Sequence, residues 1–265
     1  MTDTLKPRDA KEVEEAVRWA LGNDKALELA GQGSKRLIGR PSQTDLTLDL
    51  SGLSGVTLYE PEELVLSARA GTPLSELEEL LDNNNQQLAF EPMDYGPLLG
   101  GQAGQGTIGG VIATNLSGPR RIKAGAARDH FLGVTAVSGR AETIKSGGRV
   151  VKNVTGYDMC KLLAGSWGTL AAMTDITIKV LPKPETEASV LVSGLDDARA
   201  CAAMAAAMGS SCDVSAAAHL PDHVASYFDG LPKPQASTVL RLEGVAPSVA
   251  HRKDALAALL KAFGP

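Results

Sequence analysis

The sequence is poor in the residue types that build several common kinds of site. Its three cysteines are odd in number and show no C-x-x-C spacing, so we predict neither a disulfide framework nor an iron–sulfur or zinc site. Its four histidines form no metal-binding pair, because Pro221 lies between His219 and His223 and prevents one regular helix from presenting both. No Ser-His-Asp or Cys-His arrangement stands out, so the sequence identifies no catalytic residue.

Aromatic residues, positive charge and long apolar runs are scarce as well. Aromatics make up 4% of the 265 residues, the net charge is −5 and no basic run occurs, which argues against nucleic acid as the main partner. No stretch approaches the roughly 18 apolar residues of a membrane span. The charged N-terminus lacks the apolar region of a signal peptide. We therefore expect a cytoplasmic protein, with any membrane association made through a partner.

The sequence does contain a normal apolar share of 43%, arranged with clear periodicity. In the first two thirds the pattern predicts helices over 8–22 and 73–83 and strands over 26–30, 46–50, 65–70, 134–137, 150–151 and 174–181. Pro182 and Pro184 then break the pattern. We place a domain boundary there, which gives a first domain over residues 1–186 with subdomains at about 1–55 and 56–186.

The remaining residues, 187–265, predict a second and smaller α+β domain. The pattern indicates strands over 190–193, 214–220 and 239–243 and helices over 196–208 and 247–263. The resulting order is β-α-β-β-α, one strand short of the β-α-β-β-α-β order of a ferredoxin-like unit. We therefore expect a partial domain with one open sheet edge, to which another chain could pair.

The first candidate for ligand binding is the glycine-rich segment Gly31-Gln32-Gly33-Ser34-Lys35, directly after a predicted strand. Glycines let the backbone take positive φ and approach a ligand, and successive N–H groups can then cradle an anion. A tight surface turn would explain the same residues equally well. The segment does not match G-x-x-x-x-G-K-[ST], so it is no P-loop.

A second glycine-rich tract, 95–115, contains a G-x-G-x-x-G match from Gly104 to Gly109, and Asp129 follows twenty residues later. The dinucleotide fingerprint of a Rossmann fold must follow a strand within a βαβ unit. Here the preceding residues predict a loop, and Asp129 does not end a strand. We reject the Rossmann interpretation and expect a second stretch of backbone that faces a ligand.

Two further segments carry polar side chains next to glycines. The basic cluster at Arg120, Arg121 and Lys123 is either solvated surface or a counter-charge for a pyrophosphate. The segment 151–170 holds a short amphipathic helix, for which we expect Thr155 as N-cap and Gly165 as the stop. More small and hydroxyl residues flank that helix than its packing alone would require.

Together these segments are more specific than any one of them. The chain carries, in order, GQGSKRLIGRP, GQGTIGGVIATNLSGPRRIKAGAARDHFLGV, GGRVVKNVTGYDMCKLLAGSWGTL and TIKVLPKPE. This order closely resembles the FAD-binding domain of the vanillyl-alcohol-oxidase (PCMH-type) superfamily over about residues 8–186. Within it, the GPRR, RD-x-x-LG, KNVTGYD and GS-x-GTL elements are similar to those of the FAD-binding E subunits of bacterial glycolate oxidases.

The resemblance implies an α+β fold of two subdomains that hold an extended FAD, followed by an incomplete ferredoxin-like cap. The first loop would bind the pyrophosphate, the second would line the phosphates and the isoalloxazine edge, and the last would complete the cofactor wall. The residues implied for cofactor binding are Gly31, Gln32, Gly33, Ser34, Lys35, Thr107, Ile108, Gly109, Gly110, Ala113, Asn115, Arg120, Arg128, Asp129, Gly165, Ser166, Gly168, Thr169 and Ile176.

The resemblance also carries expectations about function. Some members tether FAD to a histidine in the first loop, and GQGSK has none, so we expect non-covalent FAD. We expect an oxidoreductase subunit that acts on glycolate or a similar 2-hydroxy acid, with a second flavin subunit and an iron–sulfur subunit as partners. The alternative is a non-catalytic flavin-binding assembly subunit, because the substrate-handling histidines of related chains are missing. Members of the family are longer, so a shortened chain is also implied.

Overall fold

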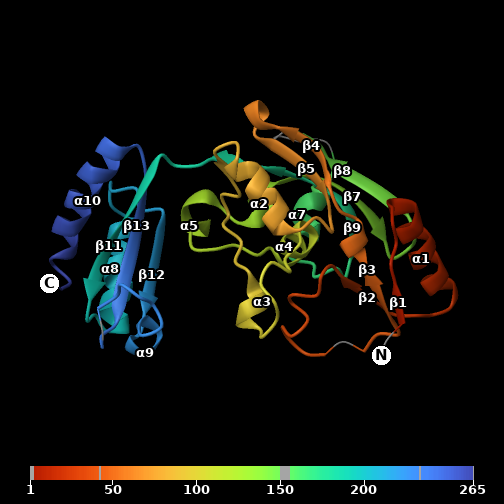
Figure 1. Cartoon of the computed structure of the whole chain (residues 1–265), viewed down its shortest axis with the longest axis horizontal. Coiled ribbons are helices and arrows are strands. Elements are labelled where there is room, and N and C mark those ends of the chain that lie inside the picture. The colour runs from red at the N-terminus through yellow and green to blue at the C-terminus, as the bar shows by residue number, and fades with distance from the viewer. Residues whose placement is uncertain (1–2, 42, 150–155, 233, 265) are drawn as a thin grey trace. The chain divides into compact units, whose positions relative to one another are not determined.

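The computed structural model describes residues 3–41, 43–149, 156–232 and 234–264. The chain forms two compact units (Figure 1). The first contains Met1–Gly118 and Gly125–Pro182, and the second contains Pro119–Ala124 and Lys183–Pro265. The division between Pro182 and Lys183 lies within the proline pair at which the sequence places a domain boundary. The short segment Pro119–Ala124 belongs to the second unit, although the residues before and after it belong to the first. The sequence did not predict this exchange.

The first unit begins with a small parallel sheet and one helix. The strands are β1 (Asp3–Leu5), β2 (Leu27–Ala30) and β3 (Leu46–Asp49), in the order β1-β3-β2. Helix α1 (Ala10–Gly22) starts where the Asp9 carboxylate accepts a hydrogen bond from the Glu12 amide. Its buried Val13 packs with Leu48 of the sheet. Strand β1 is too short and exposed to give a sequence signal.

The main sheet of this unit has five antiparallel strands in the order β4-β5-β9-β7-β8. Their bounds are β4 (Val56–Glu60), β5 (Val65–Arg69), β7 (Phe131–Ser138), β8 (Thr143–Gly147) and β9 (Ala171–Lys179). The sequence predicted β5, β7 and β9 but missed β4 and β8, whose residues are mostly half-buried or exposed. The strand expected at 150–151 lies outside the described residues.

Helices α2 (Leu74–Asp82), α4 (Ile108–Thr114) and α7 (Met159–Leu163) bury their apolar side chains against β5, β7 and β9. Leu77, Ile112 and Leu163 are almost fully buried there. Helix α2 was predicted, whereas α4 lies within a tract predicted as loop. The shorter elements of this unit are η1 (Leu50–Gly52), η2 (Pro61–Glu63), β6 (Gln86–Gln87), α3 (Tyr95–Leu98), α6 (Ala127–His130) and β10 (Leu181–Pro182).

The second unit has the predicted β-α-β-β-α order, with one extra helical turn. Its elements are β11 (Thr186–Ser193), α8 (Asp197–Met208), β12 (Ala216–Leu220), α9 (Asp222–Ala225), β13 (Ser237–Gly244) and α10 (Ala246–Leu260), together with α5 (Arg121–Ala124) from the inserted segment. The antiparallel sheet has the order β11-β13-β12. Among the described residues β11 has a paired strand on one side only, as expected for an incomplete ferredoxin-like cap.

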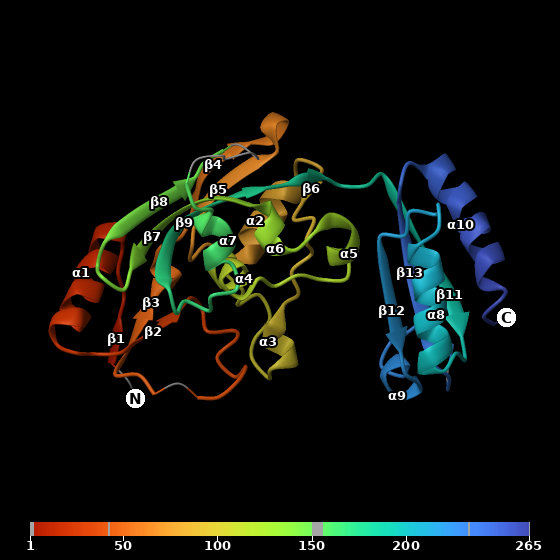
Figure 2. The ribbon, with the colours of Figure 1, turned by 180° about the vertical axis from the view of Figure 1, so that it is seen from behind.

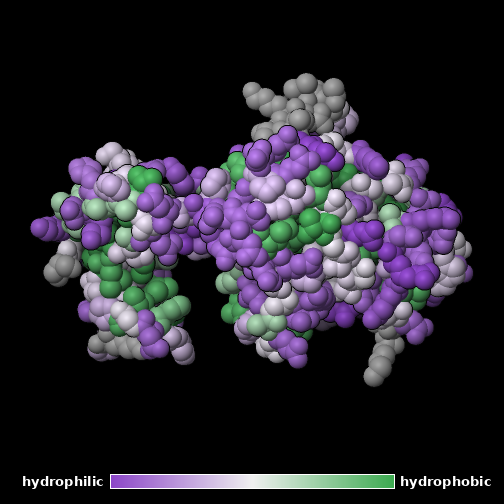
Figure 3. All heavy atoms as spheres, turned by 45° about the horizontal axis from the view of Figure 1, so that its top comes forward, coloured by the Kyte–Doolittle hydropathy of each residue, from purple (hydrophilic) through white to green (hydrophobic). Residues whose placement is uncertain are grey.

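The rear view separates the elements of the first unit, with β8 and α1 beside the ends of β7 and β9 (Figure 2). In the surface view, hydrophilic residues cover most of the visible face of this unit, with a smaller apolar area among them (Figure 3). No helix in the described part of the chain is long and apolar enough to cross a membrane.

Candidate functional site

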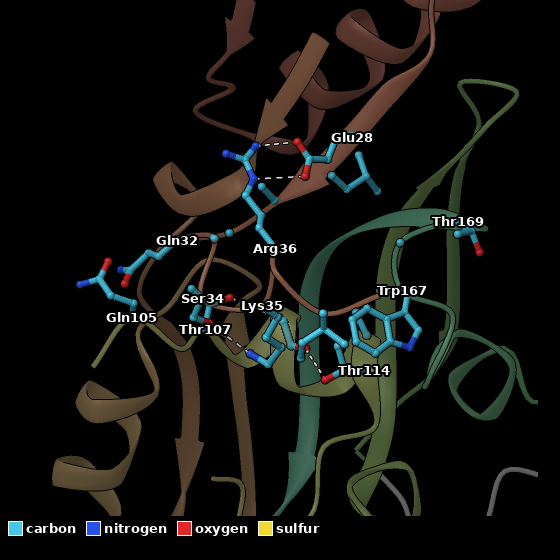
Figure 4. Close-up of a pocket in the computed structure, with 18 of the residues that line it drawn as sticks. Glu28, Gln32, Ser34, Lys35, Arg36, Gln105, Thr107, Thr114, Trp167 and Thr169 are labelled. Carbon is cyan, nitrogen blue, oxygen red and sulfur yellow. Dashed lines mark hydrogen bonds and ion pairs between the residues drawn. The ribbon is translucent and has the colours of Figure 1, made fainter. Parts of the chain in front are cut away.

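The first unit contains a cavity of about 510 Å³. Three segments form its walls: the end of β2 with the loop after it, the first turns of α4, and the loop after α7 (Figure 4). These are the three segments that the sequence singled out for their glycines. In Figure 4, Gln105 and Gln32 lie on one side, Lys35 lies near the middle, and Trp167 and Thr169 lie on the other side.

The first wall depends on two glycines for different reasons. A Cβ atom at Gly31 would lie 2.6 Å from Thr107 Oγ1, so glycine allows the loop to pass directly against the first turn of α4. Gly33 has φ +78°, a backbone conformation that glycine adopts without strain. The loop then closes with turns in which the Arg36 amide donates to the Gly33 carbonyl.

This wall presents unused hydrogen-bonding groups. Within the described residues, the backbone N–H groups of Gln32, Gly33 and Ser34 donate to no acceptor. The Oε1 atom of Gln32 is buried and also has no partner in the described part of the chain. Buried polar groups without partners are costly in folded proteins. The buried amide oxygen of Gln32 therefore favours a polar ligand, and the three successive N–H groups without acceptors can donate to it.

Lys35 places a positive charge in the same wall. Its Nζ donates to Ser34 Oγ at 3.3 Å, and no carboxylate of the described residues lies within 4 Å of it. Burial lowers the pKa of this lysine below its ordinary value of 10.5, and the more distant Asp94 carboxylate opposes the shift. A partly desolvated ammonium without a direct counter-ion would gain stability from an anionic ligand.

The second wall is the first half of α4. Thr107 is the N-cap, and its Oγ1 accepts a hydrogen bond from the Gly110 amide at 3.2 Å. Gly110 faces the cavity, with Lys35 Nζ 3.5 Å from the position of a Cβ atom. Gly109 faces the protein instead, because a Cβ atom there would lie 2.6 Å from the Ala70 carbonyl oxygen. The preceding residues form a loop and the main sheet is antiparallel, so rejecting a Rossmann unit was correct.

The third wall explains the glycines around α7. The helix is capped by Asp158, whose carboxylate accepts from the Lys161 amide, and it ends just before Gly165 with φ +82°. The loop then bonds to the end of α4, since the Gly165 amide donates to Ile112 O and the Trp167 amide to Ala113 O. Gly168 reaches the cavity beside Leu29. The prediction of Thr155 as N-cap was therefore wrong, because Asp158 caps the helix; Thr155 itself lies outside the described residues.

The structure brings most of the predicted residues to this cavity. Those that line it, or the small hollow of about 70 Å³ beside it, are Gly31, Gln32, Gly33, Ser34, Lys35, Thr107, Gly109, Gly110, Ala113, Gly168 and Thr169. Three others stand behind the wall: Asn115 Oδ1 accepts from the Arg128 amide at 2.9 Å, and the Asp129 carboxylate accepts from the Ala126 amide at 2.8 Å. These hydrogen bonds fix the backbone between α4 and α6.

The remaining predicted residues have other surroundings. Ile108 and Ile176 are fully buried in the main core, and Ser166 Oγ is buried without a partner among the described residues. Arg120 belongs to the second unit, where its guanidinium pairs with the Glu243 carboxylate. The side chains of this pair are 11% and 10% exposed. Arg120 is thus already engaged by a buried carboxylate, and we leave it out of the proposed cofactor site.

The sequence missed several residues of the cavity wall. Arg36 and Glu28 form a two-point ion pair at 3.1 and 2.6 Å, and Thr114 donates to the Gly110 carbonyl (Figure 4). Gln105 and Trp167 also line the cavity. Gln105 and Trp167 each lie next to a glycine of the segments named above, but their own residue types did not indicate ligand binding. A side chain between two loop glycines, such as Trp167, was the available clue.

The cavity offers few groups for proton transfer. Its charged side chains among the described residues are Glu28, Lys35, Arg36 and Arg40, and the single carboxylate among them is paired with Arg36. No histidine, cysteine or tyrosine of the described residues lines it. His130 is buried beside Phe90, and His219 bonds to Thr238 in the second unit. The chemistry of such a site therefore has to come from its ligand.

These features define the class of ligand. The cavity is large enough for a nucleotide cofactor, and free N–H groups with an ammonium suit a diphosphate. Residues 4–147 match the family model described as FAD binding domain, which is more than half of the chain. The chain therefore belongs to the FAD binding domain family, and FAD is the cofactor that this membership implies. The match confirms the resemblance drawn from the loops.

Individual relatives agree with this assignment. The chain is 40% identical over 176 residues to glycolate oxidase subunit GlcE of Escherichia coli (strain K12), which covers 66% of this chain and 48% of that protein. It is 32% identical over 145 residues to D-lactate dehydrogenase of Anaerostipes hadrus, covering 55% and 29%. The chain thus spans about half, or less, of these curated relatives.

A solved structure shows the same fold at low sequence identity. Alkyldihydroxyacetonephosphate synthase superposes with a TM-score of 0.77 at 19% identity, over 98% of this chain and 50% of that one. This likeness shows that the α+β fold of the chain is shared with that protein.

Proposed function

We propose that this chain is the FAD-binding subunit of a 2-hydroxy acid oxidoreductase complex, with glycolate as the substrate. The observation that carries the cofactor assignment is the wall of the cavity, where three free N–H groups adjoin the unpaired ammonium of Lys35. The substrate assignment rests on the 40% identity to a glycolate oxidase subunit and the likeness to a D-lactate dehydrogenase.

In this proposal the residues of the chain bind and orient, and bound FAD supplies the redox chemistry. The N–H groups of Gln32, Gly33 and Ser34 donate to the diphosphate, and Lys35 neutralises part of its charge. Gly31 and Gly110 keep the space between the first two walls clear. The loop around Trp167 and Gly168 closes one end of the cavity.

The proposal includes partner subunits. Cys160 and Cys212 are buried and Cys201 is exposed, and burial raises the pKa of Cys160 to about 11. A thiol with a raised pKa is a poor ligand for iron, so Cys160 suits packing rather than a cluster. We propose an iron–sulfur subunit as the electron acceptor and a second flavin subunit in the same complex.

A second candidate function is favoured by the composition of the cavity. The described wall has no histidine and no unpaired carboxylate, and abstraction of a substrate proton usually needs a positioned base. The chain would then be a flavin-binding assembly subunit without turnover of its own. Measuring the isolated subunit separates the two candidates.

We expect the isolated chain, reconstituted with FAD, to oxidise glycolate or D-lactate negligibly, and the complete complex to oxidise glycolate rapidly. The assay is dye-linked glycolate oxidation by the chain alone and with its partner subunits. Saturable turnover by the isolated chain would reject the assembly role and require a base from this chain. A complex that is equally active without this chain would reject both candidates.

The mode of attachment gives a further prediction. Because no histidine, cysteine or tyrosine of the described residues lines the cavity, FAD should be held without a covalent bond. Acid precipitation of the purified protein should release all of the flavin into the supernatant. Yellow colour that stays with the washed pellet would contradict this. A preparation that is colourless and cannot be reconstituted would contradict flavin binding itself.

A further inference from the structure

Trp167 occupies an unusual backbone conformation for its residue type. Its φ is +55°, in the left-handed region that bulky side chains rarely adopt. The nearby positive-φ positions, Gly165 and Gly168, are glycines, which take this conformation at little cost. Strained backbone conformations of this kind cluster at functional sites. The strain at Trp167 therefore requires an explanation.

Packing within the chain does not provide one. The side chain is 49% exposed, although tryptophan gains most when buried. Its ring stacks on no aromatic ring of the described residues, and its Nε1 has no hydrogen-bond partner among them. The ring lies instead at one end of the cavity, with Lys35 between it and the two glutamines at the other end (Figure 4). It also borders the adjoining apolar hollow.

The backbone that carries the indole is nevertheless held by several contacts. The Trp167 amide donates to the Ala113 carbonyl at 2.8 Å, and the Gly165 amide donates to the Ile112 carbonyl at 3.2 Å. Gly168 follows in close approach to Leu29, where a Cβ atom would lie 3.2 Å from the leucine side chain. The ring is therefore presented to the cavity by a loop attached both to α4 and to β2, and little ordering remains for a ligand to bring about.

We propose that Trp167 is the stacking platform for a planar ring of the bound dinucleotide, an inference that rests on the proposed FAD function. In Figure 4, Lys35 lies between the glutamines and Trp167, so a diphosphate held by Lys35 and the first loop would leave one ring system of FAD towards Trp167. An indole face stacks well on any fused heterocycle, as aromatic side chains do on nucleic-acid bases. The same contact offsets the cost of the strained backbone.

The test measures binding of three ligands to the purified chain by calorimetry. FAD carries both ring systems, ADP carries adenine alone, and FMN carries isoalloxazine alone. Trp167→Ala should weaken FAD binding about 10-fold, whereas Trp167→Phe, which keeps a ring, should stay within about 3-fold of the original chain. The single-ring ligand that weakens in parallel identifies the stacked ring. Unchanged affinity of Trp167→Ala for all three ligands would overturn the proposal.

A third variant separates stacking from a structural role. Trp167→Gly relieves the positive-φ strain, so its melting temperature without ligand should not fall, while its FAD affinity should fall as far as that of Trp167→Ala. If the glycine variant lost stability and affinity together while Trp167→Ala kept full affinity, the residue would be structural only. If the original chain bound no FAD, the proposed function would fail, and stacking with it. Normal FAD binding with an unaffected Trp167→Ala would remove the stacking role alone.

Discussion

Replacing Gly110 with valine should reduce FAD affinity by about 100-fold or more while leaving the fold intact. A Cβ atom at this position would lie 3.2 Å from Thr107 Oγ1 and 3.5 Å from Lys35 Nζ, so the valine methyl groups must enter the cavity between the first two walls. Gly110 lies in the regular helix α4 and its φ is not positive. Backbone freedom therefore plays no part at this glycine, and space for the ligand is the remaining reason. Flavin content after reconstitution measures the effect.

Two other glycines serve as controls for this prediction. Gly109→Val should disrupt the first unit itself, because a Cβ atom there would collide with the Ala70 carbonyl at 2.6 Å. Gly209→Val, at the end of α8 in the second unit, should lower the melting temperature without changing flavin content. If Gly110→Val and Gly209→Val lost flavin to the same extent, the assignment of the cavity to FAD would be wrong.

The sequence predicted the elements whose apolar side chains recur with a strong period. Strand β9 alternates Ile176 and Ile178 with half-buried polar residues, and α2 presents Leu77 and Leu81 to the core. These patterns are local, so they can be recognised without knowing the partners of each element. The three glycine-rich loops were recognised for a similar reason. A cluster of glycines is visible in the sequence without knowledge of the residues that it contacts in the fold.

The features that the sequence did not predict depend on contacts between residues that are distant along the chain. Helix α4 contains two glycines and follows five others of the tract 95–115, yet it forms because Thr107 caps it and Ile108 and Ile112 are buried in the core. Arg120 was a candidate ligand for phosphate in the sequence. Its ion pair with Glu243 could not be predicted from the local sequence, because the two residues are far apart along the chain. In both cases a tertiary partner outweighs the local pattern.

Replacing Lys35 with methionine should change binding and stability in opposite directions. The variant should bind FAD about 10-fold or more weakly, since a hydrogen bond to a charged group contributes about 1.5–3 kcal/mol. Without ligand, its melting temperature should rise, because the partly buried ammonium has no direct counter-ion among the described residues and methionine needs none. A residue kept only for the fold would lose stability on this change. Lys11→Met, on the exposed face of α1, is the matched control and should alter neither quantity.

The lowered pKa of Lys35 adds a pH dependence to the same experiment. Burial sets its pKa below 10.5 in the free protein, and a bound diphosphate would favour the charged form and raise the pKa again. FAD affinity should therefore fall as pH rises through the lowered pKa. Over the same window the unfolded chain still holds the proton that the folded chain has lost, so the free energy of unfolding of the ligand-free protein should increase towards pH 10.5. Both trends should be smaller in Lys35→Met, because methionine does not titrate. Equal pH profiles in the two proteins would show that Lys35 does not meet the anionic part of the ligand.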